Sequence, residues 1–270
     1  DGFEDWEYMI QRLEDEEAFW EPGTRNGYHM INFGWTVGEL VRRVSGKSLG
    51  TFFREEVADK TGARFWLGLP ETEDVHIAPI IPYAPKPDDV PTEFAIKLVT
   101  EPESIQHKSF MNNGGWDFNN RKSQAAEIGG GGGLSNARGQ VAMYTPLATD
   151  DGTLVSSDRL KAMSMVTTAT QRDATLLVPT RFGPGFMKSM DNRALNLGPG
   201  TSVIMGEQAF GHVGAGGSIG FADPEAGLAF SYTMNQMGSG ILVNDRAQSL
   251  IDAAYRALGY RTNAPGVWVK

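Results

Sequence analysis

The sequence contains no cysteine, which excludes disulfide bonds, a cysteine nucleophile and thiolate-bound metal sites. It contains only four histidines, and no two of them have the spacing of metal ligands. No apolar run reaches the roughly 18–20 residues that span a bilayer. We therefore expect no metal, no cofactor and no membrane span.

Positive charge is also scarce, since the net charge is −9 and no stretch forms a basic stripe. Nucleic acids are bound largely through phosphate contacts from Lys and Arg, so we expect no nucleic-acid partner. The acidic residues gather in residues 1–21, which hold nine Asp and Glu and one Arg. We interpret this segment as the solvated face of a helix whose other face carries Trp6, Ile10 and Leu13.

The first half of the chain has helical periodicity. Residues 33–44 are predicted to form an amphipathic helix, whose apolar positions are Phe33, Val37, Leu40, Val41 and Val44. Ser48 predicts the N-cap of a second helix that ends at Gly62. Residues 78–125 are rich in Pro, Asn and Gly and predict a long loop insertion, and short helices are expected near 136–147 and 156–168.

The pattern changes to strands after residue 180. Apolar and small residues alternate over 228–235, as in a half-buried strand, and residues 223–227 have the composition of a turn. A last helix is expected from Asn244 or Asp245 to Gly259. The order predicts an α+β fold, with a mostly helical region at 1–175 and an antiparallel sheet region at 176–270.

Two glycine-rich segments match phosphate-binding loops only superficially. Gly46-Lys47-Ser48 has Val41 where a P-loop needs its first glycine, and a helix rather than a strand precedes it. The glycines of residues 214–220 have the wrong spacing for a dinucleotide-binding loop and precede a strand. We exclude both functions.

Two other segments stand out together, residues 21–29 (Glu-Pro-Gly-Thr-Arg-Asn-Gly-Tyr-His) and residues 210–224, which contain His212-Val213-Gly214. The first resembles the Pro-Gly-Thr…Tyr segment, and the second the His-x-Gly strand, of penicillin-binding-fold serine hydrolases of the class C β-lactamase and family VIII carboxylesterase kind. Residues 46–53 and 130–139 are similar to two helix starts of that family. The resemblance implies a β-lactamase/transpeptidase-like fold, in which the regions 1–175 and 176–270 are together part of one catalytic domain.

The resemblance also implies roles for individual residues. Tyr28 would be the catalytic acid and base, and the Ala215 N–H would be one donor of the oxyanion hole. The candidate substrate-binding residues are His29, His212, Val213, Gly214 and Gly216. His212 stands where true β-lactamases have a lysine, and because histidine is mostly neutral at pH 7, this favours small neutral esters as substrates. Met30 stands two residues after the Tyr, where the family often has Ser or Asn.

The family's nucleophile is a Ser with a Lys three residues later. None of the nine lysines in this chain has Ser or Thr three residues before it. We therefore expect the Ser-x-x-Lys motif on an N-terminal segment outside these 270 residues, and this chain alone to be inactive. The alternatives are a β-lactamase or D-amino peptidase of the same fold, and a non-catalytic binding or scaffold relative.

Overall fold

The computed structural model describes residues 2–270. Its α-helices are α1 (Trp6–Asp15), α2 (Phe33–Ser45), α3 (Leu49–Phe53), α4 (Asp59–Thr61), α5 (Glu93–Thr100), α6 (Ile105–Phe110), α7 (Arg121–Ala125), α8 (Ala137–Thr149), α9 (Ser157–Met163) and α10 (Asp245–Ala257). Short 3-10 turns are η1 (Gly2–Glu4), η3 (Glu71–His76) and η4 (Arg193–Leu195), and η2 (Arg54–Ala58) is a π-helical turn. The strands are β1 (Phe65–Trp66), β2 (Leu134–Ser135), β3 (Thr168–Thr170), β4 (Thr180–Gly183), β5 (Phe186–Met187), β6 (Phe210–Val213), β7 (Ile219–Asp223) and β8 (Leu228–Tyr232).

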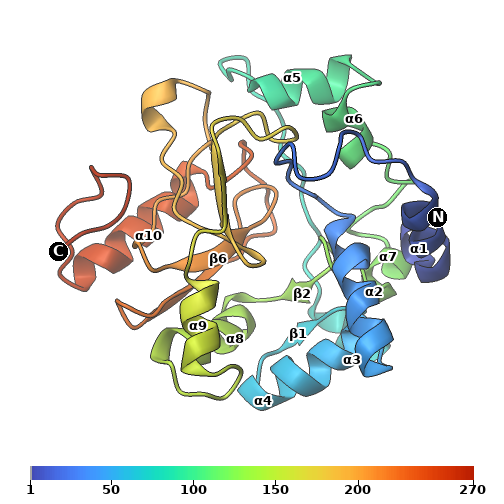
Figure 1. Ribbon diagram of the computed structural model, residues 1–270, viewed down its shortest axis with the longest axis horizontal. Coiled ribbons are helices and arrows are strands. Elements are labelled where there is room, and N and C mark those ends of the chain that lie inside the picture. Colours follow the sequence, from blue (N-terminus) through green and yellow to red (C-terminus); the bar gives the residue numbers. More distant parts are fainter. Residues whose placement is uncertain (1) are drawn as a thin grey trace.

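The elements form two regions, which Figure 1 shows side by side. One contains α1 to α7 and the antiparallel pair β1–β2. The other is a six-stranded antiparallel sheet in the order β3-β4-β5-β6-β7-β8. Helices α8 and α9 pack on one face of this sheet and α10 packs on the other. The predicted α+β class is confirmed. The sheet begins at β3, a few residues before the boundary expected at residue 175.

The strands β7 and β8 form the predicted hairpin. The Asp223 carboxylate accepts the backbone N–H groups of Glu225 and Ala226, and Gly227 has a φ of +61°, which favours glycine. Alternation then sends Phe221 and Phe230 towards α10, whereas Ala222 and its partner Ala229 lie against α8 and α9. The predicted strand ends at Tyr232 and not near Asn235.

The helix caps lie where the sequence predicts them. The Ser48 hydroxyl accepts the Thr51 N–H at the start of α3, and Gly62 ends α4 with a φ of +65°. The Asn244 side chain caps α10 in the same way. The prediction of a long loop insertion at 78–125 is wrong in part. The segment contains the helices α5, α6 and α7, with irregular loops between them. Each of these helices has a capping residue before it, namely Thr92, Ser104 and Asn120.

The predicted α2 is present, but its predicted buried face is wrong. Phe33, Leu40 and Val44 are 44%, 60% and 86% exposed. The buried face instead carries Gly34, Trp35, Gly38 and Glu39. The two glycines allow close approach, since a Cβ on Gly34 would lie 2.1 Å from the Gly130 nitrogen.

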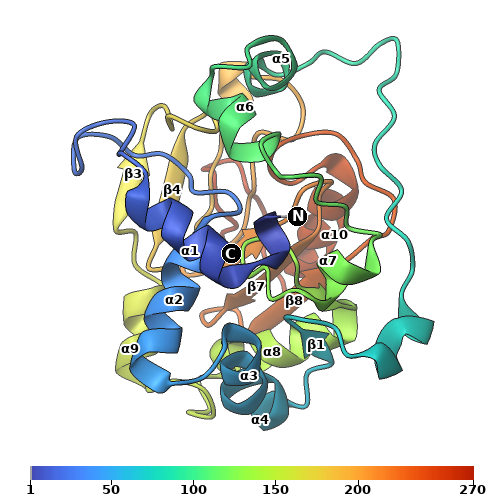
Figure 2. The ribbon, with the colours of Figure 1, turned by 90° about the vertical axis from the view of Figure 1, so that its right-hand side faces the viewer.

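The buried Glu39 connects α1 to α2. Its carboxylate accepts the Trp6 indole N–H at 2.9 Å and the Arg42 Nε–H at 2.6 Å. The Arg42 hydrogen bond is the main cause that lowers the pKa of Glu39 to about 2, so the carboxylate stays charged. Trp6 also packs against the core around Trp35, and the exposed face of α1 carries acids, as predicted. In Figure 2, α1 lies across α2 on the helical side of the molecule.

Candidate active site

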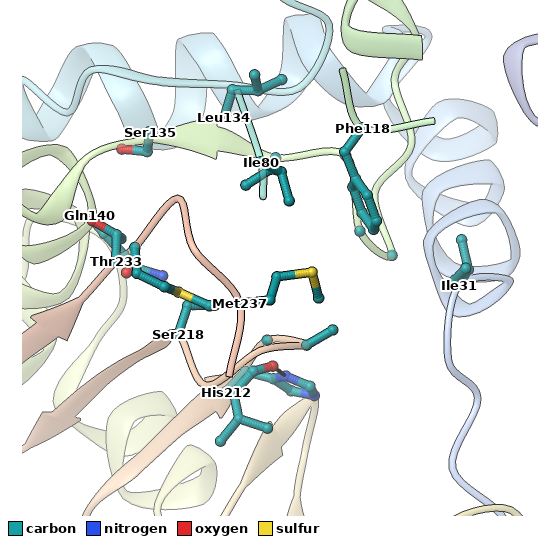
Figure 3. Close-up of a pocket in the computed structure, with 18 of the residues that line it drawn as sticks. Ile31, Ile80, Phe118, Leu134, Ser135, Gln140, His212, Ser218, Thr233 and Met237 are labelled. Atoms are coloured by element: carbon teal, nitrogen blue, oxygen red, sulfur yellow. Dashed lines mark hydrogen bonds between the residues drawn. The ribbon is translucent and has the colours of Figure 1, made fainter. Parts of the chain in front are cut away.

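A cavity of about 710 Å3 lies between the helical region and the sheet. Figure 3 shows side chains that reach it from both sides: Ile31 and Phe118 come from the helical region, and His212 and Thr233 come from the sheet region. The volume is in the range of small-molecule sites. A candidate active site therefore lies at the junction of the two regions.

Tyr28 and His212 meet in this cavity. The Tyr28 hydroxyl lies 3.4 Å from His212 Nε2, and the two rings are stacked with centroids 5.7 Å apart. His212 Nδ1 lies 2.7 Å from the Val213 carbonyl oxygen, which can only accept a hydrogen bond. The proton of a neutral His212 is therefore on Nδ1, and Nε2 offers its lone pair to the Tyr28 hydroxyl.

Both groups are held in their neutral forms. Burial lowers the pKa of His212, so that the ring is uncharged at neutral pH. Burial, and then the Asp173 carboxylate, raise the pKa of Tyr28 to about 12. The phenol can become a base near pH 7 only if a cation is brought beside it, and none of the described residues that line the cavity is Lys or Arg.

A buried carboxylate fixes the Tyr28 backbone. Asp173 Oδ1 accepts the Tyr28 N–H at 3.0 Å, and Oδ2 accepts the Asn26 side-chain N–H at 3.0 Å. The same carboxylate accepts the N–H groups of Thr175 and Leu176 in its own turn. Asp173 thus joins the loop that carries Tyr28 to the segment before β4.

The end of β6 supplies a backbone donor. The Gly214 N–H is taken by the Ser218 carbonyl at 2.7 Å, which closes the turn to β7. Within the described part of the chain, the next N–H along, that of Ala215, has no hydrogen-bond partner, and Ala215 lines the cavity. An N–H held in this way on a strand end is suited to stabilise a developing oxyanion.

The predicted residues do not all lie at the cavity. Tyr28, His212, Val213, Gly214 and Ala215 line it. His29 is exposed and is not among the lining residues.

Gly216 does not line the cavity either, and it is buried behind the turn. There its carbonyl accepts the Asn244 side-chain N–H, and a Cβ would lie 2.7 Å from Met237. Its φ of +83° favours glycine. Contact of His29 or Gly216 with substrate stays a prediction.

No nucleophile is assembled around the described Tyr28 and His212. Three serines line the cavity, Ser123, Ser135 and Ser218, and no hydrogen bond joins any of them to Tyr28 or His212. Residues 2–270 also contain no group of three or more His, Asp or Glu side chains that could hold a metal, and no helix with the length and apolarity to cross a membrane.

The cavity has further lining residues that the sequence did not indicate. One side is apolar and includes Trp116 and Phe118 from the segment at 78–125. Another contains neutral polar groups, Gln140, Ser218 and Thr233. No described lining residue is Asp, Glu, Lys or Arg. A composition without formal charge suits an uncharged ligand, because an unpaired buried ion is costly.

Comparisons with known proteins identify the family of the chain. A model of the Beta-lactamase family matches residues 1–255, so the chain belongs to the β-lactamase family. The esterase/β-lactamase LipL of Mycobacterium tuberculosis is 30% identical over 252 residues, which are 87% of this chain and 54% of LipL.

Solved structures show the same fold. A penicillin-binding protein homologue from Caulobacter crescentus has a TM-score of 0.76 at 27% identity, over 94% of this chain and 65% of its own. EstA from Arthrobacter nitroguajacolicus has a TM-score of 0.76 at 28% identity, over 95% and 66%. A family VIII carboxylesterase has a TM-score of 0.72 at 36% identity, over 94% and 64%. The predicted family and fold are confirmed. The chain spans about half the length of LipL and about two thirds of each solved chain.

Proposed function

We propose that this chain is part of a carboxylesterase that hydrolyses small neutral esters through an acyl-enzyme. One observation carries the proposal: Tyr28 and Ala215, whose N–H has no partner among the described residues, line the same cavity, and the described lining includes no Asp, Glu, Lys or Arg. The nucleophilic Ser of a Ser-x-x-Lys motif comes from a segment outside these 270 residues.

The proposed mechanism gives each group one task. The serine oxygen attacks the ester carbonyl while Tyr28 takes its proton, and the lysine of the motif supplies the cation that stabilises the phenolate. The Ala215 N–H and the serine N–H stabilise the tetrahedral oxyanion. Tyr28 then protonates the leaving alcohol, and water hydrolyses the acyl-enzyme by the same route.

His212 favours an ester over a β-lactam. Its ring is uncharged and its Nδ1–H is used by the Val213 carbonyl, so it offers no cation to the carboxylate of an antibiotic. A lysine at this position would stay charged at neutral pH unless burial lowered its pKa strongly. LipL is named both esterase and β-lactamase, and the charge-free lining favours the first activity for this chain.

The test compares two substrates on the natural full-length protein. We expect p-nitrophenyl butyrate to be hydrolysed far more efficiently than a chromogenic cephalosporin, as measured by kcat/KM. His212→Lys is the matched variant, and it should raise cephalosporin turnover relative to ester turnover. Efficient cephalosporin turnover by the unmodified protein would show a β-lactamase, and no turnover of either substrate would show a non-catalytic relative.

A further inference from the structure

One end of the cavity is a polar recess formed by Gln140, Ser218 and Thr233. Gln140 comes from α8, Ser218 from the turn between β6 and β7, and Thr233 from the residue after β8. Figure 3 shows Gln140, Ser218 and Thr233 on one side of the cavity, with Ile31 and Phe118 on the other.

Strand register brings these three side chains together. Gly220 pairs with Ser231, and a Cβ on Gly220 would lie 2.8 Å from Gln140 Nε2. Ser218 lies two residues before Gly220, and Thr233 lies two residues after Ser231, at the adjoining ends of these antiparallel strands. Because side chains alternate along a strand, both are expected on the face that carries Gln140. The recess is therefore built by α8 and by the adjoining ends of β7 and β8.

The recess has hydrogen-bonding capacity that the protein does not use. Gln140 Oε1 accepts the Ser231 hydroxyl, which fixes the amide and leaves Nε2 as a donor. Among the described residues, no partner is present for Gln140 Nε2, Ser218 Oγ or Thr233 Oγ1. All three side chains are half-buried, so they are neither fully solvated nor satisfied. Polar groups that face a cavity in this way can be satisfied by a ligand or by water.

The recess adjoins the predicted oxyanion donor. A Cβ on Gly214 would lie 2.3 Å from Ser218 Oγ, which places that hydroxyl beside the Gly214 backbone, one residue before Ala215. A group bound in the recess is thus attached close to the reacting carbonyl. The Ile31 and Phe118 side chains on the opposite side are apolar and suit an apolar group.

From this two-ended cavity we infer the substrate class: an uncharged ester with one apolar arm and one arm that carries hydroxyl groups, the second bound by Gln140, Ser218 and Thr233. This inference rests on the proposed esterase function. Gln140, Ser218 and Thr233 offer no cation to an anionic arm, and a wholly apolar arm leaves these three polar groups without partners. A hydroxyl both donates and accepts, and so matches an amide N–H and two hydroxyls.

The test uses two butyrate esters that differ only in hydroxyl groups, glycerol 1-butyrate and n-propyl butyrate. Hydrolysis of each consumes one water and releases butyric acid and the alcohol, so a pH-stat follows both reactions. We expect the natural full-length protein to prefer the glycerol ester about tenfold in kcat/KM, the size of effect that hydrogen bonds in a partly exposed site give.

Gln140→Met keeps the volume of the side chain and removes its donor, and it should reduce this preference to about one. Thr233→Val is a second variant that removes one hydroxyl without touching the Ser231 bond, and it should reduce the preference several-fold. Thr145→Val, on the exposed side of α8, is the control and should keep the preference.

The outcomes separate the two claims. Equal hydrolysis of both esters by the unmodified protein, or a preference that survives in both Gln140→Met and Thr233→Val, would overturn the inferred substrate class and leave the esterase function intact. Hydrolysis of neither ester, nor of p-nitrophenyl butyrate, would overturn the esterase function and the substrate class with it.

Discussion

The Asp173 carboxylate accepts the backbone N–H of Tyr28 at 3.0 Å, although 145 residues separate them along the chain. Asp173 lies just before β4, so this bond fixes the candidate catalytic loop against the sheet. The carboxylate also contributes to the high pKa of the Tyr28 phenol. Asp173 therefore positions Tyr28 and helps to keep its hydroxyl protonated in the described chain.

Loss of Asp173 should destabilise the fold. The side chain is 0% exposed and accepts the N–H groups of Tyr28, Thr175 and Leu176. Asp173→Ala leaves these donors without partners, and we expect the free energy of unfolding to fall by about 3 kcal/mol. Urea denaturation measures this. Asp158→Ala, at a side chain that is 97% exposed, is the control and should change stability by less than about 1 kcal/mol. Equal effects of the two changes would contradict the positioning role.

Removal of the Tyr28 hydroxyl should abolish most catalysis and leave the fold intact. Tyr28→Phe keeps the stacking on Phe182 and loses only the 3.4 Å contact with His212. In the natural full-length protein we expect kcat for p-nitrophenyl butyrate to fall by about 10²–10⁴-fold, the range of acid–base catalysis. The thermal midpoint should shift little. Near-normal turnover would end the role assigned to Tyr28.

Lys188 is a buried cation outside the cavity, and it gives stability a pH dependence. It is 1% exposed, and its Nζ has no hydrogen-bond partner among the described residues. Burial lowers its pKa to about 8 from 10.5. The unfolded chain therefore holds this proton more tightly between pH 8 and 10.5, and stability from this residue rises with pH across that window.

The test replaces Lys188 with Met, which removes the buried charge. We expect Lys188→Met to be more stable than the unmodified protein by about 1–3 kcal/mol at pH 7, with the difference shrinking as pH rises from 8 to 10. Chemical denaturation at several pH values measures this. A less stable variant with an unchanged pH dependence would show that the buried charge of Lys188 does not destabilise the folded state.

Local patterns predicted much of the fold. The caps at Ser48 and Asn244, the turn after Asp223 and the alternation of β8 are decided by residues within a few positions of one another, and the structure has each of them. The family resemblance predicted that Tyr28 and Ala215 share a cavity, which they do.

Tertiary contacts decided what the sequence did not indicate. The buried face of α2 is set by Gly34 and Gly38, because the lack of a side chain lets other segments pack closely against them. Hydrophobic periodicity does not detect a glycine of this kind. Asp173 forms an ordinary turn in its own segment, and nothing local indicates its bond to Tyr28. The polar recess around Gln140 likewise depends on the packing of α8 against β8, where the Ser231 hydroxyl bonds to a Gln140 side chain 91 residues away in the chain.

The central claim is that Tyr28 and the Ala215 N–H act on a serine from outside these 270 residues. Labelling with a fluorophosphonate probe, followed by mass spectrometry of the labelled peptide, tests it most directly. The natural full-length protein should be labelled at a Ser three residues before a Lys, and the 270-residue chain alone should not be labelled. A label on Ser123, Ser135 or Ser218 would contradict the account.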